Sequence, residues 1–168
     1  MLQARPAERE DFASIARMPL NPLELFYMYP KGVFPVSPDE LAEVAASRSS
    51  PTVVLADGAV AGYGNLYDVE RGRHGWLGNV IVHPDYRRHG IGAFLIETMG
   101  TIAREKYGAE ELRLVCHNTN TKAMLLYGRM GFKPFDMQQT TDYNGDTVVG
   151  IRMFVRLDAT DAHRKSEE

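Results

Sequence analysis

The chain has 168 residues, with 19 Lys and Arg against 22 Asp and Glu, one Cys and a hydrophobic fraction of 44%. This length suits a single domain with one sizeable core. The slight excess of acid disfavours nucleic-acid and anionic-membrane partners, since proteins that bind them normally carry a basic face. A lone Cys excludes an intrachain disulfide, and no stretch is long and apolar enough for a membrane span or secretory signal, so we expect a cytoplasmic protein.

The first part of the chain predicts a strand, a helix, an aromatic segment and a second helix. The strand covers residues 2–5, and a helix follows over 6–18, with its proline in the first turn, where the missing N–H has no partner. Residues 18–34 carry three prolines and four aromatics without a clean period. A Ser-Pro-Asp-Glu capping box at Ser37 then starts a helix that ends near residue 47.

The rest of the chain alternates between strand-like and helical patterns. Asp57-Gly58 and Asn144-Gly145 are dipeptides typical of hairpin turns. Helices are expected over 90–107, which has an apolar stripe, and 121–130. Strands are expected at residues 52–56, 59–68, 75–83, 111–117, 132–140 and 147–157. We therefore predict one α+β domain over residues 1–157, with a mixed, mostly antiparallel sheet flanked by helices, and a charged, disordered tail over 158–168.

The loop between the strand that ends near His83 and the helix that begins at Gly90 indicates a ligand site. A strand, a glycine-containing loop and a helix N-terminus form an anion-binding geometry, because the first helical turn has free N–H groups and a partial positive charge. Arg87 and Arg88 add formal charge beside it. The loop matches neither the P-loop nor the three-glycine dinucleotide pattern. The alternative to a ligand site is a purely structural role, in which a helix simply begins at Gly90 and Gly92.

These residues resemble the GCN5-related N-acetyltransferases, the GNAT family. The family fingerprint Arg/Gln-x-x-Gly-x-Gly/Ala is matched by Arg87, Gly90 and Gly92. A second family element, an Asn followed by Ala, Leu-Tyr and Gly-Phe, is matched by residues 120–132. The expected order of helices and strands also matches the family fold to about residue 157.

The resemblance implies that acetyl-CoA is the co-substrate and that acetyl passes directly to a primary amine. It implies that loop N–H groups hold the pyrophosphate, that a strand edge pairs with the pantetheine, and that Asn120 bonds to it. The N–H of Val82 would then lie near the thioester carbonyl, with Tyr127 near the sulfur as the general acid. The implied cofactor-binding residues are Val80, Ile81, Val82, Arg87, Arg88, His89, Gly90, Ile91, Gly92, Ala93, Asn120 and Tyr127.

Tyr127 and Asn120 also have ordinary interpretations, as a packing tyrosine and a helix N-cap. Cys116 is expected to be a small buried hydrophobic residue. No metal site is expected from the spacing of the histidines.

The sequence leaves the identity of the general base undecided. Many family members carry a Glu base where this chain has Val115. Glu70, His74 and His117 are the alternatives.

The acceptor side of the site is expected to combine aromatic and acidic side chains. These are Phe26, Tyr27, Tyr29 and Phe34 on one side, and Asp142, Tyr143 and Asp146 on the other. This composition favours a small cationic or aromatic amine, although the aromatics could equally be packing residues. A peptide amine and a non-catalytic acyl-CoA-binding or sensing module are the alternative functions, and a homodimer is left open.

Overall fold

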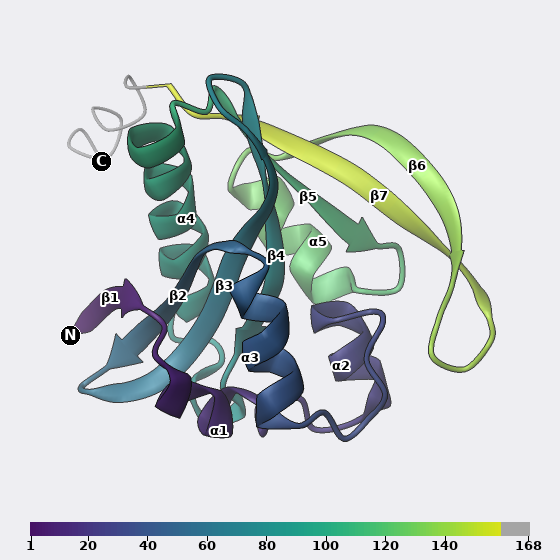
Figure 1. Cartoon of the computed structure of the whole chain (residues 1–168). Coiled ribbons are helices and arrows are strands. Elements are labelled where there is room, and N and C mark those ends of the chain that lie inside the picture. Colours follow the sequence, from purple (N-terminus) through teal and green to yellow (C-terminus); the bar gives the residue numbers. More distant parts are fainter. Residues whose placement is uncertain (159–168) are drawn as a thin grey trace.

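The computed structural model describes residues 1–158, which form one α+β domain (Figure 1). Of the tail expected over 158–168, all but Asp158 lies outside the described residues. The strands are β1 (Leu2–Pro6), β2 (Ser49–Ala56), β3 (Ala59–Glu70), β4 (His74–Val82), β5 (Glu111–His117), β6 (Lys133–Thr141) and β7 (Thr147–Arg156). They form one sheet in the order β1-β2-β3-β4-β5-β7-β6. Only β4 and β5 pair in parallel, which confirms the mixed, mostly antiparallel sheet.

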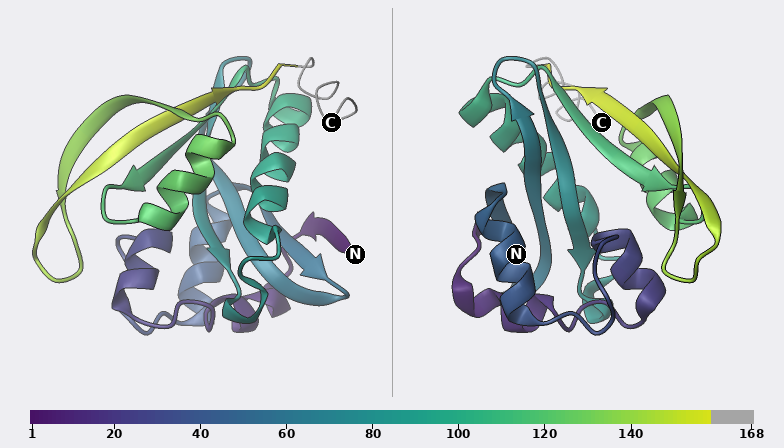
Figure 2. Two further views of the ribbon diagram at one scale, coloured as in Figure 1. Left: turned by 180° about the vertical axis from the view of Figure 1, so that it is seen from behind. Right: turned by 45° about the vertical axis from the view of Figure 1, so that its right-hand side comes forward.

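Helices cover both faces of the sheet. They are η1 (Arg9–Asp11), α1 (Phe12–Ile15), α2 (Pro22–Met28), α3 (Pro38–Ala46), η2 (Pro84–Tyr86), α4 (Ile91–Tyr107) and α5 (Thr121–Arg129). One core cluster lies between α4 and the sheet, and a second lies between the sheet and α1 to α3 on the other face (Figure 2). Among the described residues, no helix is long and apolar enough to cross a bilayer.

The turns and caps read from the sequence are present. Asp57 and Gly58 both have positive φ, +48° and +86°, as the predicted two-residue hairpin turn requires. Gly145 has a φ of +82° at the tip between β6 and β7. The Ser37 hydroxyl accepts a hydrogen bond from the Glu40 N–H at 3.1 Å, so the predicted cap of α3 is confirmed.

The helix predicted over residues 6–18 is wrong in extent. It is the 3₁₀ turn η1 followed by the single-turn α1. The Asp11 carboxylate receives two hydrogen bonds from the Arg5 guanidinium, at 2.7 and 2.9 Å, and a third from the Glu8 N–H at 2.7 Å. These bonds tie the start of the segment to β1, so only one helical turn remains to bury Phe12 and Ile15.

A helix also lies inside the segment predicted to be irregular. The Asn21 side chain accepts a hydrogen bond from the Glu24 N–H at 2.9 Å, and Pro22 occupies the first position of α2. An Asn-Pro pair at a helix start is thus the signal that the sequence interpretation overlooked.

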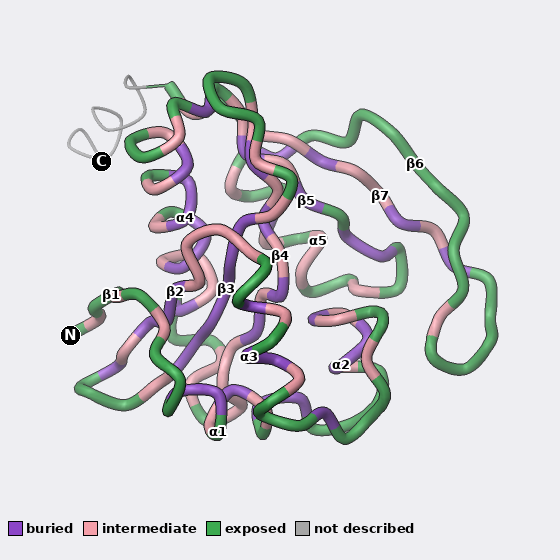
Figure 3. The backbone as a smooth tube through the Cα atoms, viewed as in Figure 1, coloured by how far each residue is buried: buried purple, intermediate pink, exposed green. Residues whose placement is uncertain are grey.

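The sheet splits between β4 and β5. These strands pair only from His74 to Trp76, opposite residues 111–113, and then diverge (Figure 2). Asn79 has a φ of +52°, where the register of β4 against β3 shifts. Such a β-bulge bends the strand that carries it. The result is a wedge between β4 and β5, with α2 at its mouth and the exposed strand β6 beyond β7 (Figure 3).

Candidate active site

The loop before α4 presents a row of unpaired backbone N–H groups. Arg88 and Gly90 have φ of +69° and +75°, and the first N–H bond of the helix runs from Phe94 to the Gly90 carbonyl. In the described part of the chain, the N–H groups of residues 88–93 therefore donate to no protein oxygen. A Cβ built on Gly90 would meet no atom within 4 Å, so the space beside the loop is open. This geometry fits an anion such as a pyrophosphate.

Arg87 does not project freely beside that loop. Its guanidinium donates to both carboxylate oxygens of Glu24 on α2, at 2.7 and 3.1 Å, and its Nε donates to the Val82 carbonyl at 3.3 Å. The hydrogen bonds from Arg87 lower the pKa of Glu24. Arg87 thus links the loop before α4 to α2 and has its charge balanced by Glu24.

The edge of β4 in the wedge carries a free backbone N–H at Val82. The His83 N–H donates to the Ala61 carbonyl at 2.8 Å, and Gly62 lies opposite Val82 in the register. Since neighbouring residues of a strand alternate the side to which their peptide groups point, the N–H and carbonyl of Val82 face away from β3. The Val82 N–H therefore points to the wedge side of the strand.

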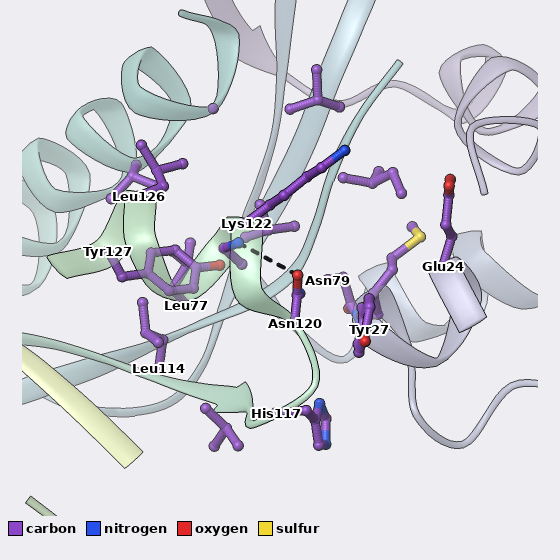
Figure 4. A pocket seen from close by; sticks show the side chains of 18 of the residues that line it. Glu24, Tyr27, Leu77, Asn79, Leu114, His117, Asn120, Lys122, Leu126 and Tyr127 are labelled. Carbon is purple, nitrogen blue, oxygen red and sulfur yellow. Dashed lines mark hydrogen bonds between the residues drawn. The ribbon is translucent and has the colours of Figure 1, made fainter. Parts of the chain in front are cut away.

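Helix α5 places Asn120 and Tyr127 across the wedge from that edge. Asn120 caps α5, because its Oδ1 accepts from the Ala123 N–H at 3.4 Å. The Tyr127 ring is buried beside Phe132 at a centroid distance of 5.7 Å, and burial raises the pKa of its phenol. Figure 4 shows this ring projecting into the pocket, with its hydroxyl toward Asn120. The hydroxyl forms no hydrogen bond with any residue that the structure describes.

One pocket of about 1290 Å³ joins these groups. Eleven of the twelve predicted cofactor-binding residues line it; the exception is His89, which is exposed. The wedge itself, rather than the loop alone, therefore brings the two family elements together. Gly92 allows a close approach of α4 to α5, since a Cβ there would lie 3.3 Å from the Leu126 side chain.

Helix α2 covers the mouth of the wedge through three polar contacts. Beside the Arg87 pair, the Tyr27 hydroxyl donates to Thr119 Oγ1 at 2.9 Å, next to α5. The Asn79 side chain donates to the Met28 carbonyl at 2.9 Å and accepts from the Asn65 amide at 2.8 Å. This buried amide pair fixes the end of α2 against the bulge of β4.

The expected acceptor residues are mostly not where the sequence interpretation put them. Of the four aromatics, only Tyr27 lines the pocket. Phe26 is buried, with its ring 4.4 Å from that of His117 and 6.3 Å from that of Tyr143. The other expected residues, Tyr29, Phe34, Asp142, Tyr143 and Asp146, do not line the pocket. The acids belong to the turn between β6 and β7, where Asp142 Oδ1 accepts from the Asn144 and Asp146 N–H groups.

The three candidate bases differ in whether they line the pocket. His117, at the end of β5, lines the pocket, whereas Glu70 and His74 do not. Burial lowers the pKa of His117 below its usual 6.5, so the imidazole is neutral at pH 7. Val115 lines the wedge and is 39% exposed. Cys116 is buried, and burial raises the pKa of its thiol to about 11, as fits a packing residue.

Several pocket residues were missed. Arg48, Tyr67 and Arg152 come from the segment after α3, from β3 and from β7, and all line the pocket. No motif marks them, because they converge only when β2, β3 and β7 take their places in the sheet. No cluster of His, Cys, Asp or Glu with the arrangement of a metal site exists in the described part of the chain.

This chain aligns with only part of the length of its curated relatives. A mycothiol acetyltransferase of Mycolicibacterium vanbaalenii is 36% identical over 86 residues, which is 51% of this chain and 27% of that protein. A thialysine N-epsilon-acetyltransferase of Bos taurus is 37% identical over 75 residues, 43% of this chain and 44% of that protein. The chain thus spans less than half the length of these relatives in the alignments.

Solved structures with the same fold include a spermidine N-acetyltransferase from Vibrio cholerae in complex with CoA and spermine. It has a TM-score of 0.78 at 21% identity, and the alignment covers 93% of this chain and 95% of that chain. A Salmonella typhimurium protein solved with its cofactor acetyl-CoA has a TM-score of 0.73 at 19% identity, and the alignment covers 94% of this chain and 95% of that chain. A sequence model of the acetyltransferase (GNAT) family matches residues 17–132. With the fingerprint loop, the wedge and this match in agreement, the chain belongs to the GNAT family of acetyltransferases.

Proposed function

We propose that this protein transfers the acetyl group of acetyl-CoA to the primary amine of a small molecule. The observation that carries the proposal is the single pocket in which the free N–H groups of residues 88–93, the Val82 edge of β4 and the Tyr127 hydroxyl meet. Relatives named for mycothiol, thialysine and spermidine acetylation support a small-molecule acceptor. A solved neighbour with acetyl-CoA supports the choice of cofactor.

The residues of the wedge fit acetyl-CoA, which supplies the activated acetyl group. The loop N–H groups of 88–93 receive the pyrophosphate, and the exposed β4 edge from Val80 to Val82 pairs with the extended pantetheine as a further strand would. The side-chain amide of Asn120 hydrogen-bonds to the same pantetheine arm. The Val82 N–H stabilises the oxygen on which negative charge develops during attack, and one such donor is typically worth about 3 kcal/mol.

His117 accepts the proton that the amine must lose. A lysine-like amine has a pKa of about 10.4, so its neutral form costs roughly 4 kcal/mol at pH 7. His117 is the one candidate base that lines the pocket, and its lowered pKa keeps it neutral and ready to accept a proton, directly or through a water. Its ring stacks near Tyr27, at a centroid distance of 6.3 Å, on the acceptor side.

Tyr127 donates its proton toward the departing sulfur. Burial raises the pKa of its phenol, so the hydroxyl stays protonated until a developing thiolate shares the proton. Because the hydroxyl has no hydrogen-bond partner among the described residues, it is free to donate.

The test is CoA release in the presence of an amine panel that includes amino acids, polyamines and a peptide with a free N-terminus. Turnover with a small amine is the expected result. Tight acetyl-CoA binding by calorimetry without turnover on any amine would instead identify a non-catalytic acyl-CoA-binding module. Turnover on the peptide alone would identify a peptide N-acetyltransferase.

A further inference from the structure

We propose that the acceptor carries a carboxylate in addition to its amine, and that Arg48 binds this carboxylate. The proposal rests on the proposed acetyl transfer and names the chemical class of its acceptor, an amino acid or a close relative of one. It replaces the expectation of a cationic acceptor, which depended on acidic side chains that lie outside the pocket.

Arg48 lies in the pocket without an ion-pair partner among the described residues. Its guanidinium stacks over the Tyr67 ring, 4.5 Å from Cζ to the centroid, and its Nη1 donates one long hydrogen bond of 3.4 Å to the Asn65 side chain. No carboxylate of the described residues lies within 4.0 Å of it, whereas Arg87 has Glu24 and Arg152 has Asp136 at 3.4 Å. Arg48 is thus a half-buried cation whose remaining donors have no protein anion.

The backbone leaves space for this guanidinium. A Cβ on Gly78 would lie 2.6 Å from Arg48 Nη1 and 2.8 Å from the Tyr67 ring. The glycine at this position thus leaves the space beside β4 that Arg48 and the Tyr67 ring occupy. The guanidinium is a planar group with several parallel donors, which suits the two hydrogen bonds of an arginine–carboxylate pair.

The charges lining the pocket favour an anion on this side. Glu24 is the one lining carboxylate among the described residues, and Arg87 already balances it. Arg48 and Arg152 both act electrostatically on the Tyr67 phenol, but Arg152 already pairs with Asp136, so Arg48 is the one of these two cations that has no ion pair among the described residues. A second positive charge on the acceptor would be repelled there, since like charges in a half-buried site destabilise each other.

The position of Arg48 is compatible with the proposed chemistry. Gly78, against which it lies, precedes Val80 in β4, so the guanidinium is at the end of the wedge away from the pyrophosphate-binding loop. A pantetheine that runs along β4 from that loop ends on the Gly78 side. His117 and Arg48 both line the pocket, so an acceptor beyond the pantetheine can place its amine toward His117 and its carboxylate toward Arg48.

The experiment compares amino acids with their decarboxylated amines. Lysine is paired with cadaverine and tyrosine with tyramine, and kcat/KM is measured at saturating acetyl-CoA for the wild type. We expect the carboxylate-bearing member of at least one pair to be preferred by about tenfold or more, as is typical for hydrogen bonds to a charged group. Equal kcat/KM within every pair that reacts would overturn the proposal.

Two variants assign the preference to Arg48. In Arg48→Gln the preference should disappear through loss of activity on the carboxylate-bearing member alone, with the KM for acetyl-CoA unchanged. Arg48→Lys keeps the positive charge without the planar guanidinium and should retain part of the preference for the carboxylate-bearing member. This variant also shows whether a folding defect explains the result for Arg48→Gln. The matched control is Arg71→Gln, since Arg71 also stacks on a tyrosine, Tyr107, at 5.2 Å but lies outside the pocket. Equal losses on both members of a pair would mean that Arg48 is merely structural and would overturn the proposal.

A binding measurement separates this inference from the proposed function. If no amine is acetylated, the proposed function fails. Calorimetric titration of the CoA-bound protein with N-acetyl-lysine, which retains the carboxylate, then tests Arg48 without turnover. Binding to the wild type that is lost in Arg48→Gln would support the carboxylate site, and no binding, or equal binding to both, would overturn it.

Discussion

The two halves of the pocket are built in different ways. The half proposed for the cofactor uses backbone groups from a short stretch of chain, the N–H groups of residues 88–93 and the edge of β4. The half proposed for the acceptor is lined by side chains from distant elements, among them Tyr27, Arg48, His117 and Arg152. A backbone site can serve any member of a fold family, because it depends on chain conformation, whereas a side-chain site changes with each substitution. The comparison predicts that variants in one half should leave the other half's ligand largely unaffected.

The largest expected effect concerns the chemical step, where the halves meet. Tyr127→Phe removes only the hydroxyl and keeps the ring against Phe132. General-acid contributions are typically about 10²–10⁴-fold, so kcat should fall by about this factor while calorimetry finds unchanged CoA affinity. Tyr107→Phe, outside the pocket, is the control. Near-normal kcat in Tyr127→Phe, measured where chemistry limits the rate, would reduce Tyr127 to a packing residue.

A second variant tests the base on the acceptor side. His117→Gln should lower kcat/KM by about 10²-fold, at the lower end of the range for acid–base groups. The neutral imidazole is the active form and its pKa lies below 6.5, so wild-type activity should fall as the pH drops through that lowered pKa. The variant should lose this acidic limb of the pH profile. An unchanged limb would assign the titration to another group and contradict the role of His117.

The cofactor half is tested at Gly90, whose φ is +75°. A β-branched residue is strained there by about 1–3 kcal/mol, so Gly90→Val should distort the loop and weaken acetyl-CoA binding by about 5- to 150-fold. Gly145→Val places the same strain at φ +82°, at the hairpin tip outside the pocket, and should keep full affinity. Circular dichroism checks the fold of both. Equal CoA affinity in folded Gly90→Val and wild type would contradict the loop as the pyrophosphate site.

The smallest effect is expected at Tyr27, on the helix that covers the wedge. Tyr27→Phe removes the 2.9 Å hydrogen bond to Thr119 and should raise the acceptor KM by about 2- to 10-fold, the usual net value of one such bond. The KM for acetyl-CoA should remain constant. If both KM values rise together, α2 supports the whole wedge, and the two halves are not independent.

Local signals determined much of this protein. The turns at Asp57 and at Gly145, the cap at Ser37 and the glycine-flanked start of α4 follow from residues adjacent in the chain. Backbone conformations of this kind depend on neighbours a few residues away, so a single sequence reveals them. The loop of residues 88–93, which we propose as the pyrophosphate site, was predictable for the same reason.

Only the tertiary structure decided the acceptor half. Arg48 becomes a pocket residue because Gly78 makes room for it and Tyr67 supports it, and neither contact is visible from the residues beside Arg48. The acids near Asp142 hydrogen-bond within their own turn instead of facing the pocket, although the sequence placed them in a plausible region. Charge complementarity depends on which side chains come together in space. Here they meet around the wedge that opens where β4 and β5 separate, and no local sequence pattern encodes that separation.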